Sequence, residues 1–295
     1  MQLKGSITAL TTPFAESGLI DLPAWRAQID IQLNSGSSAV VVAGSTGEAS
    51  ALSDAEFSQL IELASIRVSG RIPILAGTGQ SSTTKTIKQT KLAKSSGAAI
   101  ALVVTPPYVR PTQAGLVAHY LAVADASEIP IILYNVPART GCDLLPETVA
   151  KLNSHQNIIG LKEAVGDQQR WQALYAVATP SFGLLSGDDA SFIQAIQGGA
   201  QGVISVAANA VPATFAQICN FLQDGNAAAA ETLDSMLRNF YDFLGVEPNP
   251  VPIKAVMQFL GFGHGLRLPM LPLSEPYRDL ARQMADLCKT VEQSI

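Results

Sequence analysis

The chain has 295 residues, of which 47% are hydrophobic and 15% are charged, a composition that supports a large folded core and excludes a disordered protein. Its formal net charge is −5, which argues against general attraction to nucleic acid or to an anionic membrane surface. The N-terminal stretch lacks a basic segment followed by a long apolar one, and no window of the sequence is apolar enough for a membrane span. We therefore expect a soluble, cytoplasmic protein that binds any anionic substrate locally.

Eight short runs rich in β-branched residues recur along the chain, each followed by a stretch with helical spacing. In order they are SITALTTPF, SAVVVAGS, IPILAGTG, IALVVTPPY, IPIILYNVP, NIIGLKEAV, FGLLSGDD and GVISVAAN. Nearly continuous apolar strands that alternate with helices predict parallel pairing with both faces covered. Eight such units favour a closed (β/α)8 TIM barrel over an open doubly wound sheet. No GxGxxG follows the first run, which argues against a dinucleotide-binding fold.

The pattern changes to helices alone from about Pro212. We expect the first of them to be the eighth barrel helix. The rest, including the helical segments AAAAETLDSMLRNFYDFL, PIKAVMQFLGF and EPYRDLARQMADLCKTVE, form a small C-terminal bundle. The sequence thus predicts an α/β barrel over residues 1–224, which carries the active site, and a C-terminal helical domain over residues 225–295.

Reacting groups in such a barrel lie at the C-terminal ends of the strands, where the βα loops converge. The predicted strands place these polar residues there: Thr11, Thr12, Ser45, Thr46, Glu48, Thr78, Tyr108, Tyr134, Asn135, Arg139, Lys162, Glu163, Asp188, Asp189 and Ser205. The histidines fall elsewhere, which disfavours a metal-dependent aldolase. Cys142, Cys219 and Cys288 are widely spaced and form no CxxC pair, so we expect buried free thiols.

Lys162 ends the otherwise apolar run Ile158 to Leu161. Burial disfavours the charged form of an amine, and a free amine is what attacks a ketone to form a Schiff base. The alternative is a lysine that reaches out of the barrel mouth and pairs with Glu163. Placement alone leaves both interpretations open. Lys254 is the rival amine, but its helix reads as amphipathic, and we expect its side chain on the solvated face.

Other groups at the same end suit a reaction on a small acid. The phenol of Tyr134 is expected close to the lysine and could shuttle protons, with Ser45 and Tyr108 as a hydroxyl relay. The turn Gly44 to Glu48 offers backbone N–H groups and hydroxyls to a carboxylate. The planar fork of Arg139 suits a second carboxylate. Each group also has an ordinary structural interpretation: tyrosines with satisfied hydroxyls, and a salt bridge in a loop.

Five stretches resemble a known family in order and spacing: GSTGE at 44–48, YNVPARTG at 134–141, GLKEAVGD at 160–167, SGDD at 186–189 and GVISVAAN at 202–209. The family comprises the dihydrodipicolinate synthases and the N-acetylneuraminate lyases, and the resemblance covers essentially the whole chain. It implies a Schiff base between pyruvate and Lys162, proton transfer by Tyr134, and a relay through Ser45 and Tyr108. It further implies a homodimer or homotetramer, with Tyr108 supplied by the neighbouring subunit.

The resemblance also implies the substrate contacts. Thr46, the backbone of Ile204, and Gly187 are expected to bind the pyruvate side of the site, and Arg139 the carboxylate of L-aspartate 4-semialdehyde. The implied reaction is condensation of these two substrates in diaminopimelate and lysine biosynthesis. It needs no cofactor or metal, because the iminium serves as the electron sink.

Two alternatives stay open at this point. One is a pyruvate-dependent lyase of a sugar-derived 2-oxo acid such as N-acetylneuraminate, and the other is a catalytically silent barrel that binds a small anion. Ser45 stands where the synthases usually carry threonine and the sialic acid lyases often carry serine, so it does not decide, whereas Arg139 favours the synthase. Regulated members carry acidic and polar side chains at the positions of Lys85 and Ser81 and an aromatic at Pro107, so we expect weak or absent inhibition by lysine.

Overall fold

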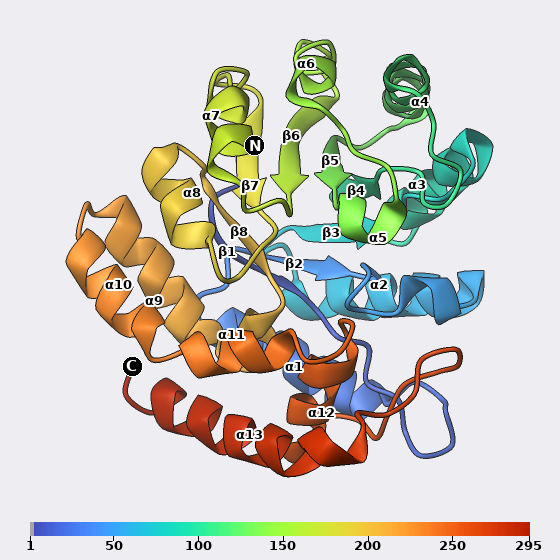
Figure 1. Cartoon of the computed structure of the whole chain (residues 1–295). Helices are drawn as coiled ribbons and strands as arrows, with labels where there is room; N and C mark the ends of the chain where they lie inside the picture. The colour runs from blue at the N-terminus through green and yellow to red at the C-terminus, as the bar shows by residue number, and fades with distance from the viewer. Residues whose placement is uncertain (1–2) are drawn as a thin grey trace.

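The computed structural model describes residues 3–295 and is a closed barrel of parallel strands (Figure 1). Neighbouring strands in the chain are neighbours in the barrel, and β8 closes it by pairing with β1. The strands are β1 Gly5–Ala9, β2 Ala39–Val42, β3 Ile74–Gly77, β4 Ile100–Val104, β5 Ile131–Asn135, β6 Ile158–Glu163, β7 Gly183–Ser186 and β8 Gly202–Ser205. The predicted fold class is confirmed. Residues 1 and 2 of the predicted barrel domain lie outside the described residues.

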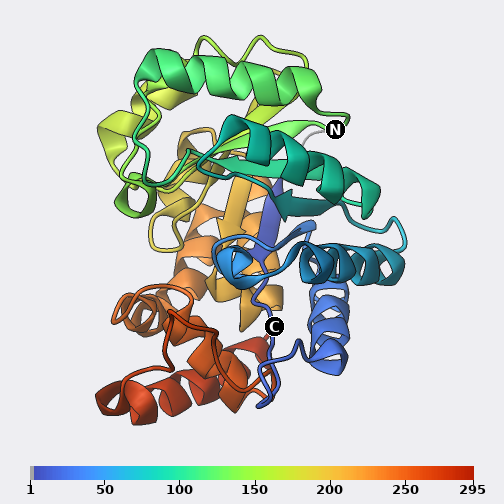
Figure 2. The same ribbon diagram turned by 90° about the vertical axis from the view of Figure 1, so that its right-hand side faces the viewer.

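Helices follow the strands and cover the outside of the barrel (Figure 2). They are α1 Leu22–Asn34, α2 Asp54–Val68, α3 Thr83–Ser95, α4 Gln113–Ala126, α6 Pro146–Val149, α7 Gln168–Tyr175, α8 Phe192–Gly198 and α9 Pro212–Gln223, with the short turns η1 Ala49–Ala51, α5 Pro137–Thr140 and η2 Ala207–Asn209. Their starts follow capping chemistry. Before α2, the Ser53 hydroxyl accepts a hydrogen bond from the backbone N–H of Glu56. The Glu56 carboxylate in turn accepts one from the backbone N–H of Ser53, so two backbone donors that the helix leaves free are satisfied.

Side chains alternate between the two faces of the barrel wall. One buried cluster, which includes Ile7, Leu75, Ile132 and Ile204, fills the interior. A second cluster lies between the strands and the surrounding helices and includes Val40, Leu60 and Leu133. Because successive residues of a strand face opposite sides, Tyr134 and Lys162 share the interior face, whereas Asn135 and Glu163 face the helices.

The chain ends in α10 Ala227–Ser235, α11 Arg238–Leu244, α12 Val251–Phe259, η3 Glu275–Tyr277 and α13 Arg278–Glu292. The stretch expected as one helical segment from Ala227 to Leu244 is in fact two helices, because a turn at Met236 and Leu237 interrupts it. Leu237, Phe240 and Phe243 are all fully buried. All three belong to the apolar cluster that the C-terminal helices share with the barrel.

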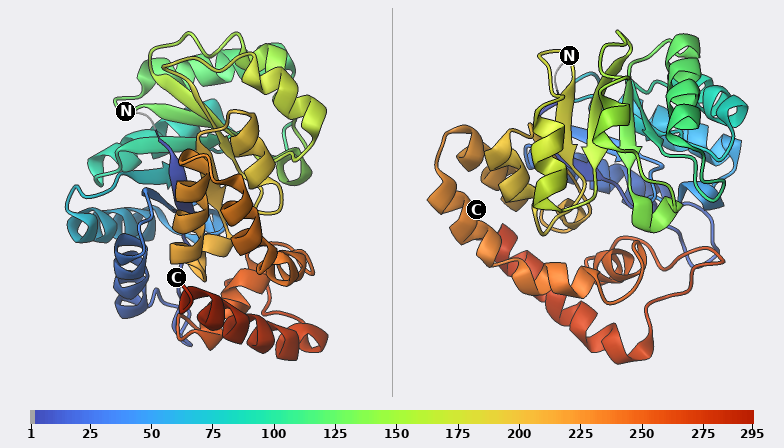
Figure 3. Two further views of the ribbon diagram at one scale, coloured as in Figure 1. Left: turned by 90° about the vertical axis from the view of Figure 1, so that its left-hand side faces the viewer. Right: turned by 45° about the horizontal axis from the view of Figure 1, so that its top comes forward.

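These helices lie toward the end at which the arrowheads of β5 and β6 point (Figures 1 and 3). Their apolar cluster is shared with the barrel, because Phe192, Val203 and Phe215 pack with Ile253 and Cys288. We retain a division at residues 224/225, between α9 and α10, as a proposal that limited proteolysis can test. The C-terminal helices are therefore neighbours of the loops in which the sequence placed the site.

Candidate functional site

Lys162 and Tyr134 lie side by side on adjacent strands at the C-terminal end of the barrel. They are register partners in the β5–β6 ladder, and Lys162 Nζ is 4.4 Å from the centroid of the Tyr134 ring. Lys162 is 4% exposed and forms no ion pair within residues 3–295. Its predicted alternative partner, Glu163, faces the other side of the strand. A buried amine without a counter-ion, next to a phenol, is equipped to attack a carbonyl carbon.

Gly187, which follows β7, leaves the space that the Lys162 side chain occupies. A Cβ at this position would lie 2.7 Å from Lys162 Cε and 3.1 Å from Lys162 Cγ. The Gly187 N–H also donates to the carbonyl of Glu163 at 2.7 Å. The backbone of residue 187 is thereby held against the strand that carries the lysine.

Gly187→Ala is expected to displace the lysine amine. Because a displacement of about 1 Å can cost on the order of 10²-fold in rate, we expect kcat to fall roughly 10- to 100-fold while the thermal midpoint changes by only a few degrees. Gly265→Ala is the matched control, because a Cβ there meets no atom within 4 Å. Equal kcat values in both variants would contradict this role of Gly187.

A buried polar network lies behind the lysine, on the helix side of the barrel wall. The Glu163 carboxylate accepts from Asn135 Nδ2 at 3.0 and 3.1 Å and from the Val165 N–H at 2.9 Å, and Arg170 Nε lies 3.4 Å away. Arg170 also pairs with Asp143. The network joins β5, β6 and α7 to the segment after α5, and it holds the backbone of the two strands that carry Tyr134 and Lys162.

Burial raises the pKa of Glu163 to about 7, against the hydrogen bonds from Asn135 and Val165 and the charge of Arg170, which lower it. Below its ordinary pKa of 4.5 the group is protonated in both states; above 7 the folded state must hold the charged form at a cost. Stability should therefore fall as pH rises through this window, by about 1 kcal/mol between pH 6 and pH 8. Thermal unfolding at both pH values should show this fall in the unmodified protein and a smaller one in Glu163→Gln. Identical pH dependences would contradict it.

The turn after β2 presents Thr46 as a buried residue and Ser45 as an exposed one. Backbone bonds from Gly47 to Gly44 and from Glu48 to Ser45 close the turn, and Thr12 Oγ1 donates to the Gly47 carbonyl at 2.7 Å. Ile204, in β8, is fully buried in the interior cluster. Thr46 follows β2 and Ile204 lies near the C-terminal end of β8, and both of these strands pair with β1.

Arg139 lies in the short helix α5 and is exposed. Its Nη1 donates to the carbonyl of Asn249 at 3.0 Å, and Asn249 Nδ2 donates to Thr46 Oγ1 at 3.0 Å. Asn249 belongs to the segment before α12, so a residue of the C-terminal part bridges two loops of the barrel. Sequence reasoning missed Asn249, since its local pattern carries no chemical signal.

Tyr108 lies on the loop after β4 and points away from the rest of the chain, with 91% of its surface exposed. Its φ of 74° lies in the left-handed region that non-glycine residues rarely adopt. Within residues 3–295 it makes no hydrogen bond to Ser45 or Tyr134, so a single chain does not assemble the predicted relay.

Several of the other polar residues predicted at this end support the fold. Thr11 N–H donates to Asn209 Oδ1, Thr90 donates to Thr78, and Asp189 Oδ2 accepts from the N–H groups of Val206 and Ala207. Asp188 accepts from Ser191, and Ser205 Oγ accepts from the Ala208 N–H. These contacts fix the turns after β1, β3, β7 and β8.

The expectation for Lys254 is wrong. Its side chain is buried rather than solvated, and its ammonium pairs with Glu48. The partner of Lys254 lies on a barrel loop. Hydrophobic periodicity within one helix does not reveal such a partner. Burial lowers the pKa of Lys254 despite the opposing effect of Glu48.

A closed (β/α)8 barrel with a buried lysine and an adjacent tyrosine at the C-terminal ends of its strands is the arrangement of class I lyases, and this chain is an enzyme of that type. The model of the Dihydrodipicolinate synthetase family matches residues 2–287. The chain is 55% identical to the 4-hydroxy-tetrahydrodipicolinate synthase of Xanthomonas axonopodis pv. citri, over 97% of this chain and 94% of that protein.

Solved structures agree with this similarity. The chloride-inhibited dihydrodipicolinate synthase from Acinetobacter baumannii, complexed with pyruvate, superimposes with a TM-score of 0.95 at 39% identity, over 98% of this chain and 99% of the other. A monomeric dihydrodipicolinate synthase variant gives a TM-score of 0.94 at 36% identity, over 97% of each chain. The chain belongs to the dihydrodipicolinate synthetase family, which confirms the resemblance inferred from its motifs.

Proposed function

We propose that the chain catalyses the condensation of pyruvate with L-aspartate 4-semialdehyde, the activity for which its relatives are named, in diaminopimelate and lysine biosynthesis. The observation that carries the proposal is the buried amine of Lys162 beside Tyr134. The identity of 55% with a named 4-hydroxy-tetrahydrodipicolinate synthase supports the choice of the second substrate.

The chemistry proceeds through a Schiff base. Lys162 Nζ adds to C2 of pyruvate, and the carbinolamine loses water to give an iminium. Loss of a C3 proton gives an enamine, whose carbon adds to the aldehyde carbon of the second substrate. The amino group of that substrate then adds to C2 and displaces Lys162, which closes the ring. Tyr134 carries the protons in these steps, and no metal or cofactor is required.

We propose the remaining contacts from the family resemblance, and the positions of the residues at the barrel mouth support them. Thr46 and the backbone of Ile204 hold the pyruvate carboxylate, Gly187 keeps the lysine in register, and Arg139 binds the carboxylate of the aldehyde. Arg139 is exposed and keeps donors beyond its bond to Asn249, so a bidentate contact to a carboxylate is open to it.

We further propose that Tyr108 completes the proton relay of a neighbouring subunit in a homodimer or homotetramer. Its nearly full exposure and its left-handed backbone support a role outside its own chain. Mixing Tyr108→Phe with Lys162→Ala subunits tests this. Half of randomly formed dimers are hybrids with one complete site, so activity should return to about a quarter of the unmodified level. Absence of recovery in verified hybrids would place Tyr108 outside the partner's site.

The test of the proposed function is a coupled assay that supplies pyruvate with L-aspartate 4-semialdehyde, in parallel with an assay of N-acetylneuraminate cleavage. We expect turnover in the first assay alone, and undiminished turnover after treatment with a chelator. Turnover of N-acetylneuraminate at a higher kcat/KM would favour the sugar-acid lyase. Absence of turnover in both assays would favour the silent barrel.

Lysine is expected to inhibit weakly or not at all. Lys85 is exposed on α3, where its ammonium would repel that of the effector, and Ser81 Oγ donates to the Pro107 carbonyl at 2.9 Å. A steady-state titration with lysine at fixed substrates measures this. Half-inhibition at sub-millimolar lysine would contradict the expectation.

We also propose a cytoplasmic location. Cys142, Cys219 and Cys288 are buried free thiols, as expected, and unpaired cysteines are usual in a reducing compartment. Within residues 3–295, no helix combines the length and the apolar character that a membrane crossing needs. Fractionation of cells that produce the protein at its natural level tests the location.

A further inference from the structure

Glu48 and Lys254 form an ion pair that is almost completely shielded from water. Glu48 follows β2 and Lys254 lies in the first turns of α12, and their side chains are 3% and 4% exposed. The second carboxylate oxygen of Glu48 accepts from the Arg267 N–H at 3.0 Å. Removing two charges from water costs about as much as their attraction returns, so a buried pair is a weak source of stability. The positions of the segments that the pair joins explain its presence better than its contribution to stability does.

Two cations of this region lie against the ring of Phe14. Lys254 Nζ is 4.2 Å and Arg267 Cζ 4.3 Å from the centroid of the ring, within the range of cation–π attraction. The backbone of the same residue is fixed as well, because the His264 N–H donates to the Phe14 carbonyl at 2.7 Å. The loops after β1 and β2 are thereby fastened to the C-terminal helices.

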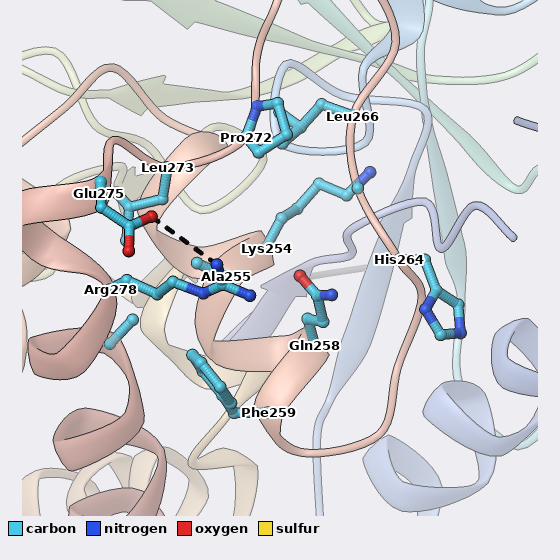
Figure 4. Close-up of a pocket in the computed structure, with 12 residues that line it drawn as sticks. Lys254, Ala255, Gln258, Phe259, His264, Leu266, Pro272, Leu273, Glu275 and Arg278 are labelled. Carbon is cyan, nitrogen blue, oxygen red and sulfur yellow. Dashed lines mark ion pairs between the residues drawn. The ribbon is translucent and has the colours of Figure 1, made fainter. Parts of the chain in front are cut away.

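A cavity of about 370 Å³ borders this region between α12, α13 and the segment that joins them (Figure 4). Lys254 is one of its lining residues, but its ammonium points away from the Glu275–Arg278 ion pair on the other side of the cavity. The amine is engaged by Glu48 rather than offered to a ligand.

The ion pair lies a few residues from the bridge at the barrel mouth. Glu48 is two residues beyond Thr46, and its φ of 53° is one that a glutamate rarely adopts without support. On the other side, the Lys254 N–H donates to the Pro250 carbonyl at 2.9 Å, and Asn249 is the residue directly before Pro250. Asn249 in turn contacts both Thr46 and Arg139.

We propose that the Glu48–Lys254 pair is a positioning device: it docks the C-terminal helices so that Asn249 sets the spacing between Thr46 on the pyruvate side and Arg139 on the aldehyde side. Glu48 and Lys254 touch neither substrate and act through Asn249. The inference rests on the proposed function for the identity of the two substrates. It makes the C-terminal helices part of the site for the second substrate.

The test separates stability from positioning. Glu48→Gln and Lys254→Met each leave a buried partner uncompensated and should lower the thermal midpoint, whereas the double variant removes both charges and should recover it. We expect the double variant to keep a KM for L-aspartate 4-semialdehyde raised about tenfold. Borohydride trapping at saturating pyruvate should match that of the unmodified enzyme, because Lys162, Tyr134 and Gly187 make no contact with the pair. The exposed pair Asp54–Lys88 supplies the control double variant Asp54→Asn/Lys88→Met.

Recovery of both the thermal midpoint and the KM in the double variant would show a purely structural pair and overturn the proposal. If the double variant does not recover its thermal midpoint, Asn249→Ala decides, because it removes the bridge and keeps the ion pair. A raised aldehyde KM in Asn249→Ala supports the proposal, and an unchanged KM overturns it. Failure of the proposed function is distinguishable, since the unmodified enzyme would then show no aldehyde-dependent turnover.

Discussion

Lys162→Ala is expected to reduce turnover of pyruvate and L-aspartate 4-semialdehyde by at least about 10⁴-fold, because the covalent intermediate cannot form without the amine. The other buried lysine, Lys254, cannot replace it, since its nitrogen is committed to Glu48. Steady-state rates in the coupled assay measure the loss. Lys151→Ala, at an exposed position, is the matched control and should retain the rate of the unmodified enzyme.

The substitution at residue 162 should leave the fold intact, because Ala fits within the space that the buried lysine side chain occupies. A circular dichroism spectrum and a thermal midpoint near those of the unmodified protein are therefore expected. A folded Lys162→Ala variant that kept more than a few per cent of the activity would contradict the assignment of the amine.

Tyr134→Phe is expected to lower kcat by about 10²- to 10⁴-fold, the range for loss of a positioned acid–base group. The ring that packs beside Lys162 stays, and the hydroxyl alone is lost, so pyruvate should still form some adduct but more slowly. Tyr120→Phe is the matched control, because the Tyr120 hydroxyl donates to the Val103 carbonyl at 3.2 Å in a buried position on α4, away from the site. Rates within a factor of two in the two variants would contradict proton transfer by Tyr134.

The barrel was predictable from the sequence because parallel strands buried on both faces read as apolar runs, and the runs alternate with capped helices eight times. The same regularity places Tyr134 and Lys162 at one end. Their pairing in adjacent strands then follows from the register of β5 and β6. For this part of the site, local patterns and the rules of the fold were sufficient.

Other features depend on contacts between distant segments. The partner of Lys254 is Glu48, 206 residues earlier in the chain, so the periodicity of α12 alone led to the wrong prediction of a solvated side chain. The bridge made by Asn249 likewise joins three segments that are remote in sequence. The need for a glycine at position 187 becomes visible only once the Lys162 side chain has been placed, because a Cβ there would collide with that side chain.

The role of Tyr108 does not follow from local sequence patterns. In one chain Tyr108 is 91% exposed, so the proposal of a relay across subunits combines this exposure with the family resemblance. The monomeric variant among the solved relatives indicates that assembly varies within this fold, which makes the subunit-mixing experiment informative for this chain in particular.

The central claim is that Lys162 forms an imine with pyruvate, and borohydride reduction tests it most directly. The enzyme is incubated with pyruvate, reduced, digested and mapped by mass spectrometry. We predict one adduct, on the peptide that contains Lys162, which disappears in Lys162→Ala and is absent from Lys254. An unmodified Lys162 under saturating pyruvate, or an adduct on a different lysine, would contradict the account.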